Sequence, residues 1–141
     1  MEMRDRIRQR FQSVLKLEPG EITVTSSDKV FLTRAMEIVE EYMEDPDFTV
    51  ETFARELAVS RPLLFTKIKA ITNQTPNNFV KALRMKRSAQ LLVQADWGVA
   101  EIAYQVGFKD ARYFSKCFYK EFGITPSEYR IKNKLLSIDN Q

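Results

Sequence analysis

The stretch that decides the fold is VAEIAYQVGFKDARYFSKCFYKEFGITP, from Val99 to Pro126. Its apolar residues follow helical spacing on both sides of Gly107, which suits a tight turn because glycine takes positive φ freely. Asp110 can accept a backbone N–H at a helix start, and Gly123 is typical of the position just past a helix end. The stretch therefore predicts two short helices joined by a tight turn, a helix-turn-helix.

An earlier segment, VETFARELAVSRPLLFTKIKAITNQTP from Val50, repeats this pattern. Ala54 aligns with Ala103, where two helices are expected to cross closely. Ser60 aligns with Asp110 as a helix cap, and both segments end in Thr-Pro, which suits the start of a further helix. One helix hairpin is a weak signal, but two copies with matching caps predict two helix-turn-helix units.

The two copies differ in their turns. Ala58 stands where the second copy has Gly107, and a residue with a Cβ adopts positive φ only at a steric cost. We therefore expect the first turn to be shaped differently from the second. At the helix ends, Asn73 aligns with Gly123 and is the usual substitute for glycine in the left-handed conformation.

The remaining sequence is also helical in pattern. No stretch shows sustained strand alternation, so the expected class is all-α with about seven helices and an extra N-terminal linker helix over Met1 to Leu17. A cap for the first domain helix is expected among Ser26, Ser27 and Asp28. The expected boundaries are 1–28 for the linker helix and an extended segment, 29–132 for the domain, 29–44 for its first helix, 50–72 and 99–122 for the helix-turn-helix units, 76–95 for the long central helix that joins them, and 133–141 for a flexible tail.

Charge is distributed unevenly along the 141 residues. Residues 1–60 carry 8 Lys and Arg against 13 Asp and Glu, whereas residues 61–141 carry 14 against 6. A basic C-terminal half favours a polyanion such as nucleic acid as the partner. The alternative is a basic surface that only keeps the protein in solution.

The composition argues against several classes of function. The chain has no His and one cysteine, Cys117, and it shows no Gly-rich phosphate loop and no carboxylates at metal-ligand spacing. We therefore expect no enzyme activity, no cofactor, no metal site and no internal disulfide, with Cys117 in the core. No apolar run is long enough to cross a bilayer and no signal peptide is evident, which indicates a cytoplasmic protein.

The second copy, in IAYQVGFKDARYFSKCFYKEFGITPSEYR, resembles the signature of the AraC/XylS family of bacterial transcription regulators. The first copy and TPNNFVKALRMKRSAQLL also fit that family's DNA-binding domain, over about residues 29–132. The resemblance implies sequence-specific binding of double-stranded DNA, with the second helix of each unit in one of two adjacent major grooves. The alternative is a helical protein-interaction module without sequence-specific DNA binding.

The upstream stretch FQSVLKLEPGEITVTSSDKVFLTRAMEIVEEYM resembles the junction between a receiver domain and an AraC-type domain in hybrid two-component systems. This resemblance implies the output domain of a membrane-tethered sensor and regulator, an activator with an upstream receiver domain and RNA polymerase as partners. An apolar stripe overlaps the start of this stretch and can pack on this domain, on a receiver or on a second copy as a homodimer; its residues are Ile7, Phe11, Val14 and Leu15.

Each second helix is expected to have one buried and one outward face. In the second copy the predicted buried stripe is Tyr113, Phe114, Cys117, Phe118 and Phe122, and in the first copy it is Leu64, Ile68 and Ile71. By family position, the residues expected to contact bases are Arg61, Pro62, Phe65, Thr66, Ala111, Arg112, Ser115 and Lys116. The alternative for the charged members is a solvated face.

The chemistry of these residues differs between the copies. Arg112 can bond guanine O6 and N7 bidentately, and Lys116 can do so less selectively or reach a phosphate. Phe65 is expected to be an exposed ring that packs on thymine methyls or sugars, or else to pack against a neighbouring helix. The first copy is therefore predicted to read bases more by apolar contact.

Phosphate contacts are expected from basic side chains and from the two capped helix starts, whose backbone N–H groups can bind anions. The residues are Ser60, Lys69, Lys81, Arg84, Arg87, Asp110 and Lys120. A solvated face is the alternative for Lys81, and the resemblance implies a structural or phosphate-positioning role for Arg84. Periodicity places Tyr119 and Lys120 at the boundary between the two faces and assigns neither.

Overall fold

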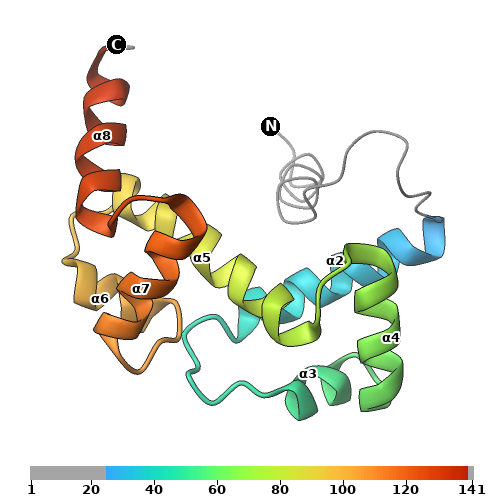
Figure 1. The fold of residues 1–141 in the computed structure, drawn as a ribbon. Coiled ribbons are helices and arrows are strands. Elements are labelled where there is room, and N and C mark those ends of the chain that lie inside the picture. The colour runs from blue at the N-terminus through green and yellow to red at the C-terminus, as the bar shows by residue number, and fades with distance from the viewer. Residues whose placement is uncertain (1–24, 140–141) are drawn as a thin grey trace. The chain divides into compact units, whose positions relative to one another are not determined.

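The structure is a computed structural model that describes residues 25–139 (Figure 1). All elements in this range are helices, as predicted: α2 (Ser26–Glu41), α3 (Val50–Glu56), α4 (Arg61–Thr72), α5 (Pro76–Gln94), α6 (Val99–Gln105), α7 (Ala111–Phe122) and α8 (Pro126–Asp139). The helix expected over Met1 to Leu17 lies outside the described residues. The all-α prediction is confirmed.

Two helix boundaries differ from the prediction. The cap of α2 is Thr25, whose Oγ1 accepts a hydrogen bond from Asp28 N at 3.1 Å while the Asp28 carboxylate accepts one from Thr25 N at 3.4 Å. This reciprocal capping box starts the helix at Ser26. At the other end α8 continues to Asp139, so most of the expected tail is helical. The sequence there contains no Gly or Pro to stop the helix.

The described chain forms two compact units. Unit 1 contains the residues up to Tyr42 and residues 48–83, and unit 2 contains Met43–Asp47 and the residues from Arg84 onward. The first part of α5 belongs to unit 1 and the remainder to unit 2. Each unit therefore holds one helix-turn-helix: α3 and α4 in unit 1, and α6 and α7 in unit 2.

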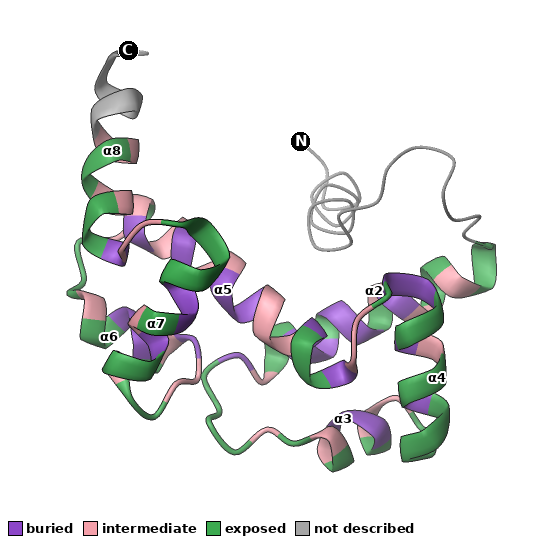
Figure 2. Ribbon diagram, in the orientation of Figure 1, coloured by how far each residue is buried: buried purple, intermediate pink, exposed green. Residues whose placement is uncertain are grey.

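The core of unit 1 contains buried apolar side chains from all of its helices, including the predicted stripe of α4 (Figure 2). Phe53 of α3 and Phe79 of α5 are fully buried, and their rings stack with centroids 6.2 Å apart. Ala54 of α3 and Leu83 of α5 are also buried, and α2 and α4 contribute further buried side chains, including Leu32, Ala35, Ile38, Val39, Leu64, Ile68 and Ile71. The predicted stripe of α4 is confirmed, and it fixes which side of that helix faces outward.

The core of unit 2 confirms part of the predicted stripe of α7. Phe114, Cys117 and Phe118 are buried, so Cys117 is a core residue. Tyr113 is 53% exposed and Phe122 37% exposed, so the prediction that both rings face inward is wrong. They lie on the flanks of the stripe: Tyr113 contacts Phe108, and Phe122 contacts Phe118 and Tyr129 with centroids 4.5 and 5.6 Å away.

The C-terminal end of α5 is held by α8. Arg130 Nε donates to Leu92 O at 2.9 Å, and Nη2 donates to the carbonyls of Ala95 and Trp97. A cation that binds the last carbonyls of a helix also interacts favourably with the helix dipole. Arg130 therefore stabilises the link between α5 and α6 within unit 2.

The two turns have the same conformation, and the prediction that they differ is wrong. Ala58 has φ of 57° and Gly107 has φ of 83°. Val59 N donates to Ala54 O at 3.0 Å, and Phe108 N donates to Ala103 O at 2.9 Å. This matched bonding is the Schellman type of helix ending. In the first turn, the bond from Val59 N to Ala54 O holds Ala58 in a left-handed conformation that its side chain disfavours.

Candidate nucleic-acid interface

The outward face of α7 carries a row of three polar side chains. The helix begins at Ala111 because Asp110 Oδ1 accepts hydrogen bonds from Arg112 N at 2.7 Å and Tyr113 N at 3.4 Å. With Phe114 and Phe118 buried, Arg112 and Lys116 are exposed one turn apart. Two of the predicted base-contacting residues, Ala111 and Ser115, are half-buried beside them.

Tyr119 continues this row. It lies three residues beyond Lys116, and spacings of three and four place side chains on one helix face. Its ring is 57% exposed. Lys120 is also exposed, in the last turn of α7. The structure therefore places Tyr119 with Arg112 and Lys116, a position that periodicity alone left open.

The outward face of α4 is more apolar. Its predicted base-contacting residues, Arg61, Pro62, Phe65 and Thr66, are all exposed. Phe65 is 49% exposed, so about half of its surface is covered and half is open to apolar contact. Thr66 Oγ1 donates to Pro62 O at 2.9 Å, so its hydrogen is engaged within the helix.

Arg61 is paired but remains accessible. Its Nη1 lies 3.2 Å from Glu51 Oε1, and both side chains are well exposed. Exposed pairs of this kind contribute only about 0–1 kcal/mol, so the guanidinium can exchange its partner at little cost.

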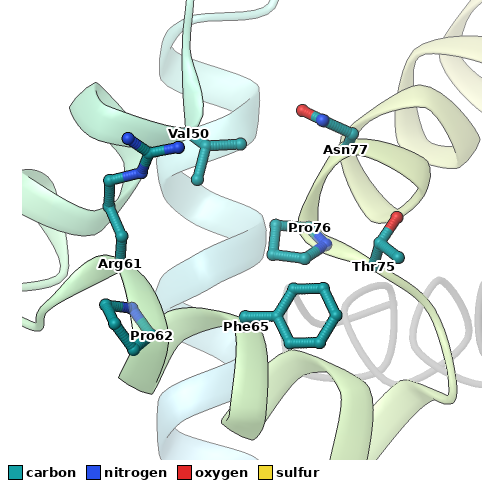
Figure 3. Close-up of a pocket in the computed structure, with 7 residues that line it drawn as sticks. All are labelled: Val50, Arg61, Pro62, Phe65, Thr75, Pro76 and Asn77. Carbon is teal, nitrogen blue, oxygen red and sulfur yellow. The ribbon is translucent and has the colours of Figure 1, made fainter.

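A hollow of about 610 Å³ lies beside this face of α4 (Figure 3). The starts of three helices line it, with the residues Val50, Arg61, Pro62, Phe65, Thr75, Pro76 and Asn77. Three of these were predicted base contacts. The other four come from the starts of α3 and α5, where the sequence showed only helix-start signals, so their convergence could not be read from spacing along the chain.

Arg84 is buried, and the prediction of a phosphate contact is corrected. It is 7% exposed, with Nη1 donating to Val106 O at 2.8 Å and Nη2 to Asp45 O at 2.9 Å. Burial lowers its pKa, and the nearby Asp45 carboxylate partly offsets this. A buried guanidinium that donates to two backbone carbonyls is not available to DNA, so Arg84 has the structural role.

Gly107 leaves the space that Arg84 occupies. A Cβ at this position would lie 1.3 Å from Arg84 Nη1 and 2.7 Å from Met43 O. Nearby, Lys109 Nζ is 2.7 Å from Asp47 Oδ1, and this hydrogen bond raises the pKa of Lys109. The turn before α7 is therefore tied to the segment Met43–Asp47, all within unit 2.

The other predicted phosphate contacts differ in availability. The predicted phosphate contact at Asp110 is also corrected. Its carboxylate occupies the start of α7 and would repel a phosphate there. Ser60 caps α4 by accepting from Leu63 N, and Lys69 is exposed with Nζ 3.4 Å from Asn73 O. Lys81 and Arg87 are half-buried and make other interactions.

In the described part of the chain, no group of three His, Cys, Asp or Glu side chains is placed to hold a metal ion. None of the helices described combines the length and the apolar character that crossing a bilayer requires.

Residues 53–132, more than half of the chain, match the family described as a helix-turn-helix domain, which is of AraC type. The chain belongs to this AraC-type helix-turn-helix family. The family consists of DNA-binding transcription regulators rather than enzymes, and the chain is a DNA-binding domain of that kind. The family resemblance and the function class predicted from the sequence are confirmed.

Relatives of this AraC-type domain include longer proteins. It is 48% identical over 130 residues to Histidine kinase P4 of Formosa agariphila, which covers 92% of this chain and 10% of that protein. It is 38% identical over 81 residues to the HTH-type transcriptional activator RhaS of Mannheimia succiniciproducens, covering 57% of this chain and 30% of that protein. The chain thus spans a third or less of these relatives.

Solved structures of similar proteins share the fold. The C-terminal domain of AraT, a response regulator from Geobacillus stearothermophilus, is 28% identical with a TM-score of 0.67, covering 79% of this chain and 88% of that one. A transcriptional regulator from Chromobacterium violaceum, of the proteins containing an AraC-type DNA-binding domain, is 29% identical with a TM-score of 0.71, covering 77% and 96%.

Proposed function

We propose that α4 and α7 are recognition helices that insert into adjacent major grooves of duplex DNA and read its sequence. The observation that carries this proposal is the outward row Arg112, Lys116 and Tyr119 on a helix whose opposite face is fixed in the core. An α-helix fits the major groove, and residues near its start reach base edges. The cap at Asp110 and the exposed Arg112 provide that arrangement.

The residues of α7 then have distinct roles. Arg112 bonds guanine O6 and N7, and Lys116 contacts a guanine or the neighbouring phosphate. Ala111 packs on a thymine methyl, and Ser115 hydrogen-bonds a base edge; both are half-buried and have short side chains. Tyr119, further along the helix, donates its hydroxyl to a phosphate.

The residues of α4 carry the equivalent roles with less hydrogen bonding. Arg61 exchanges its exposed pair with Glu51 for a base or phosphate, and Pro62, Phe65 and Thr66 present the apolar and hydroxyl surface described above. Lys69 lies 50 residues before Tyr119, the same separation as between the caps Ser60 and Asp110, so the two residues are equivalent in the repeat. Lys69 therefore takes the corresponding phosphate role. Ser60, Lys81, Arg87 and Lys120 complete the proposed phosphate set.

Selection of bound duplexes from a random pool tests this proposal. We expect enrichment of one motif with two parts about one helical turn, roughly 10 base pairs, apart, because the two helices would lie in successive grooves. If the selected duplexes share only one part of this motif, only one of the two helices reads the sequence. The absence of any motif, with binding insensitive to salt, would support the protein-interaction alternative instead.

We also propose a biological context, the output domain of a hybrid two-component regulator. The 48% identity to a segment covering 10% of a protein named a histidine kinase supports it. In that context the domain is a cytoplasmic activator, with an upstream receiver domain, RNA polymerase and a second copy as partners. Determining the full coding sequence around this segment tests the proposal: adjacent kinase and receiver sequences are expected, and their absence would refute it.

A further inference from the structure

The hollow beside α4 has a wall that cannot make side-chain hydrogen bonds. The Phe65 ring extends toward Thr75 and Pro76, as Figure 3 shows. Pro62 lies three residues before Phe65 on the same exposed face. Phenylalanine has no polar side-chain atom, and proline lacks even a backbone N–H. This wall therefore offers apolar contact and nothing with which to read a donor or an acceptor.

Polar groups lie only around this wall. Arg61 and Asn77 come from α4 and α5, on different sides of the two proline rings (Figure 3). Thr75 Oγ1 already accepts a hydrogen bond from Asn78 N at 3.2 Å, which leaves it engaged as a cap. The arrangement is an apolar seat with hydrogen-bonding groups at its rim.

One group in the major groove suits such a seat. Every base edge there presents hydrogen-bond donors or acceptors, and thymine alone adds a C5-methyl group. We propose that the hollow seats the 5-methyl group of a thymine on Phe65, Pro62 and Pro76, so that unit 1 recognises an A·T pair by apolar contact. This inference rests on the proposed function of α4 as a recognition helix and assigns the chemistry of its specificity.

The test is replacement of each thymine of a selected duplex by deoxyuridine, which removes only the methyl group. Burial of one such group is worth about fourfold in affinity, so we expect at least one thymine whose replacement weakens binding by about that factor. In the Phe65→Ala variant the same replacement is expected to change affinity much less. Phe65→Leu, which keeps an apolar side chain, retains most of the difference.

Two controls locate the effect. Positions whose base preference relaxes in Arg112→Ala mark the half of the site read by α7, and the sensitive thymine is expected in the other half. Because Phe65 is half-exposed, Phe65→Ala is expected to fold, and a melting temperature close to that of the parent chain checks this.

Three results would overturn the inference. If a duplex binds with full affinity after every thymine is replaced, the hollow does not bind a thymine methyl group, although the proposed DNA binding stands. Equal weakening of thymine and deoxyuridine duplexes by Phe65→Ala would mean that the ring packs on sugars. A selected motif with no thymine in the half read by α4 would exclude the proposal at once, whereas failure to bind any duplex would refute the proposed function itself.

Discussion

At the residue scale, the clearest conformational strain is at Ala58. Its φ of 57° disfavours any side chain, by about 1–2 kcal/mol for an ordinary residue. Ala58→Gly removes this cost in the folded state. It also makes the unfolded chain more flexible, which offsets part of the increase in stability. We expect the free energy of unfolding to rise by about 0.5–1 kcal/mol in urea denaturation.

The matched variant at the equivalent turn is expected to act in the opposite direction. Gly107→Ala places a Cβ 1.3 Å from Arg84 Nη1 and also imposes the left-handed cost. The loss is expected to be about 3 kcal/mol or more. Stabilisation by Gly107→Ala, or destabilisation by Ala58→Gly, would contradict the equivalence of the two turns.

Arg84 gives a second prediction at this scale. Arg84→Met leaves the carbonyls of Val106 and Asp45 without their donor, which should destabilise the domain by about 2–4 kcal/mol. Thermal melting measures this loss. If Arg84 contacted phosphate instead, the variant would keep its melting temperature and lower the salt dependence of DNA binding.

At the element scale, the proposed roles of the α7 residues predict different effects for a base contact and a phosphate contact. Arg112→Ala is expected to lower affinity by about 1–3 kcal/mol for the preferred sequence and to relax preference at one guanine. Lys120→Ala is expected to weaken all duplexes alike and to reduce the salt slope by about one. Fluorescence anisotropy with single-base variants of the duplex distinguishes them. If both variants lower affinity without altering preference, the assignment of Arg112 is wrong.

Tyr119 provides a finer test on the same helix. Tyr119→Phe removes one hydroxyl and leaves the ring, which is exposed on the outward row. Loss of one hydrogen bond of about 0.5–1.5 kcal/mol predicts a twofold to tenfold weaker affinity, equal for all sequences. A change in base preference would place the hydroxyl on a base instead of a phosphate.

The helices, their caps and the repeat could be predicted from the sequence, because each depends on residues close together in the chain. Ser60 and Asp110 act as caps as expected. The left-handed conformation of Ala58 could not be predicted, because hydrogen bonds of the turn override the backbone preference of alanine. For Arg84 the family resemblance implied a structural role, but helical periodicity could not, because periodicity sorts residues by polarity and this guanidinium is buried against carbonyls of distant segments. The hollow required three helix starts to converge, and that is a property of tertiary structure.

At the scale of the whole molecule, affinity for DNA should depend strongly on salt. If about six phosphates are neutralised, the dissociation constant is expected to rise roughly 10³-fold between 50 and 200 mM salt. Titration of one duplex across this range measures the slope. A shallow slope would indicate few phosphate contacts and would favour reading mainly through bases.

The segment Met43–Asp47 has a consequence for how this domain can be divided. Unit 2 is discontinuous in sequence, since these residues precede α3 yet belong with α6 and α7. A gene fragment that begins at α5 would therefore lack the carbonyl of Asp45 and the Asp47 partner of Lys109. The two repeats are consequently not equivalent modules: a fragment that contains the second repeat is expected to be more stable when it also carries Met43–Asp47, the segment that precedes the first repeat.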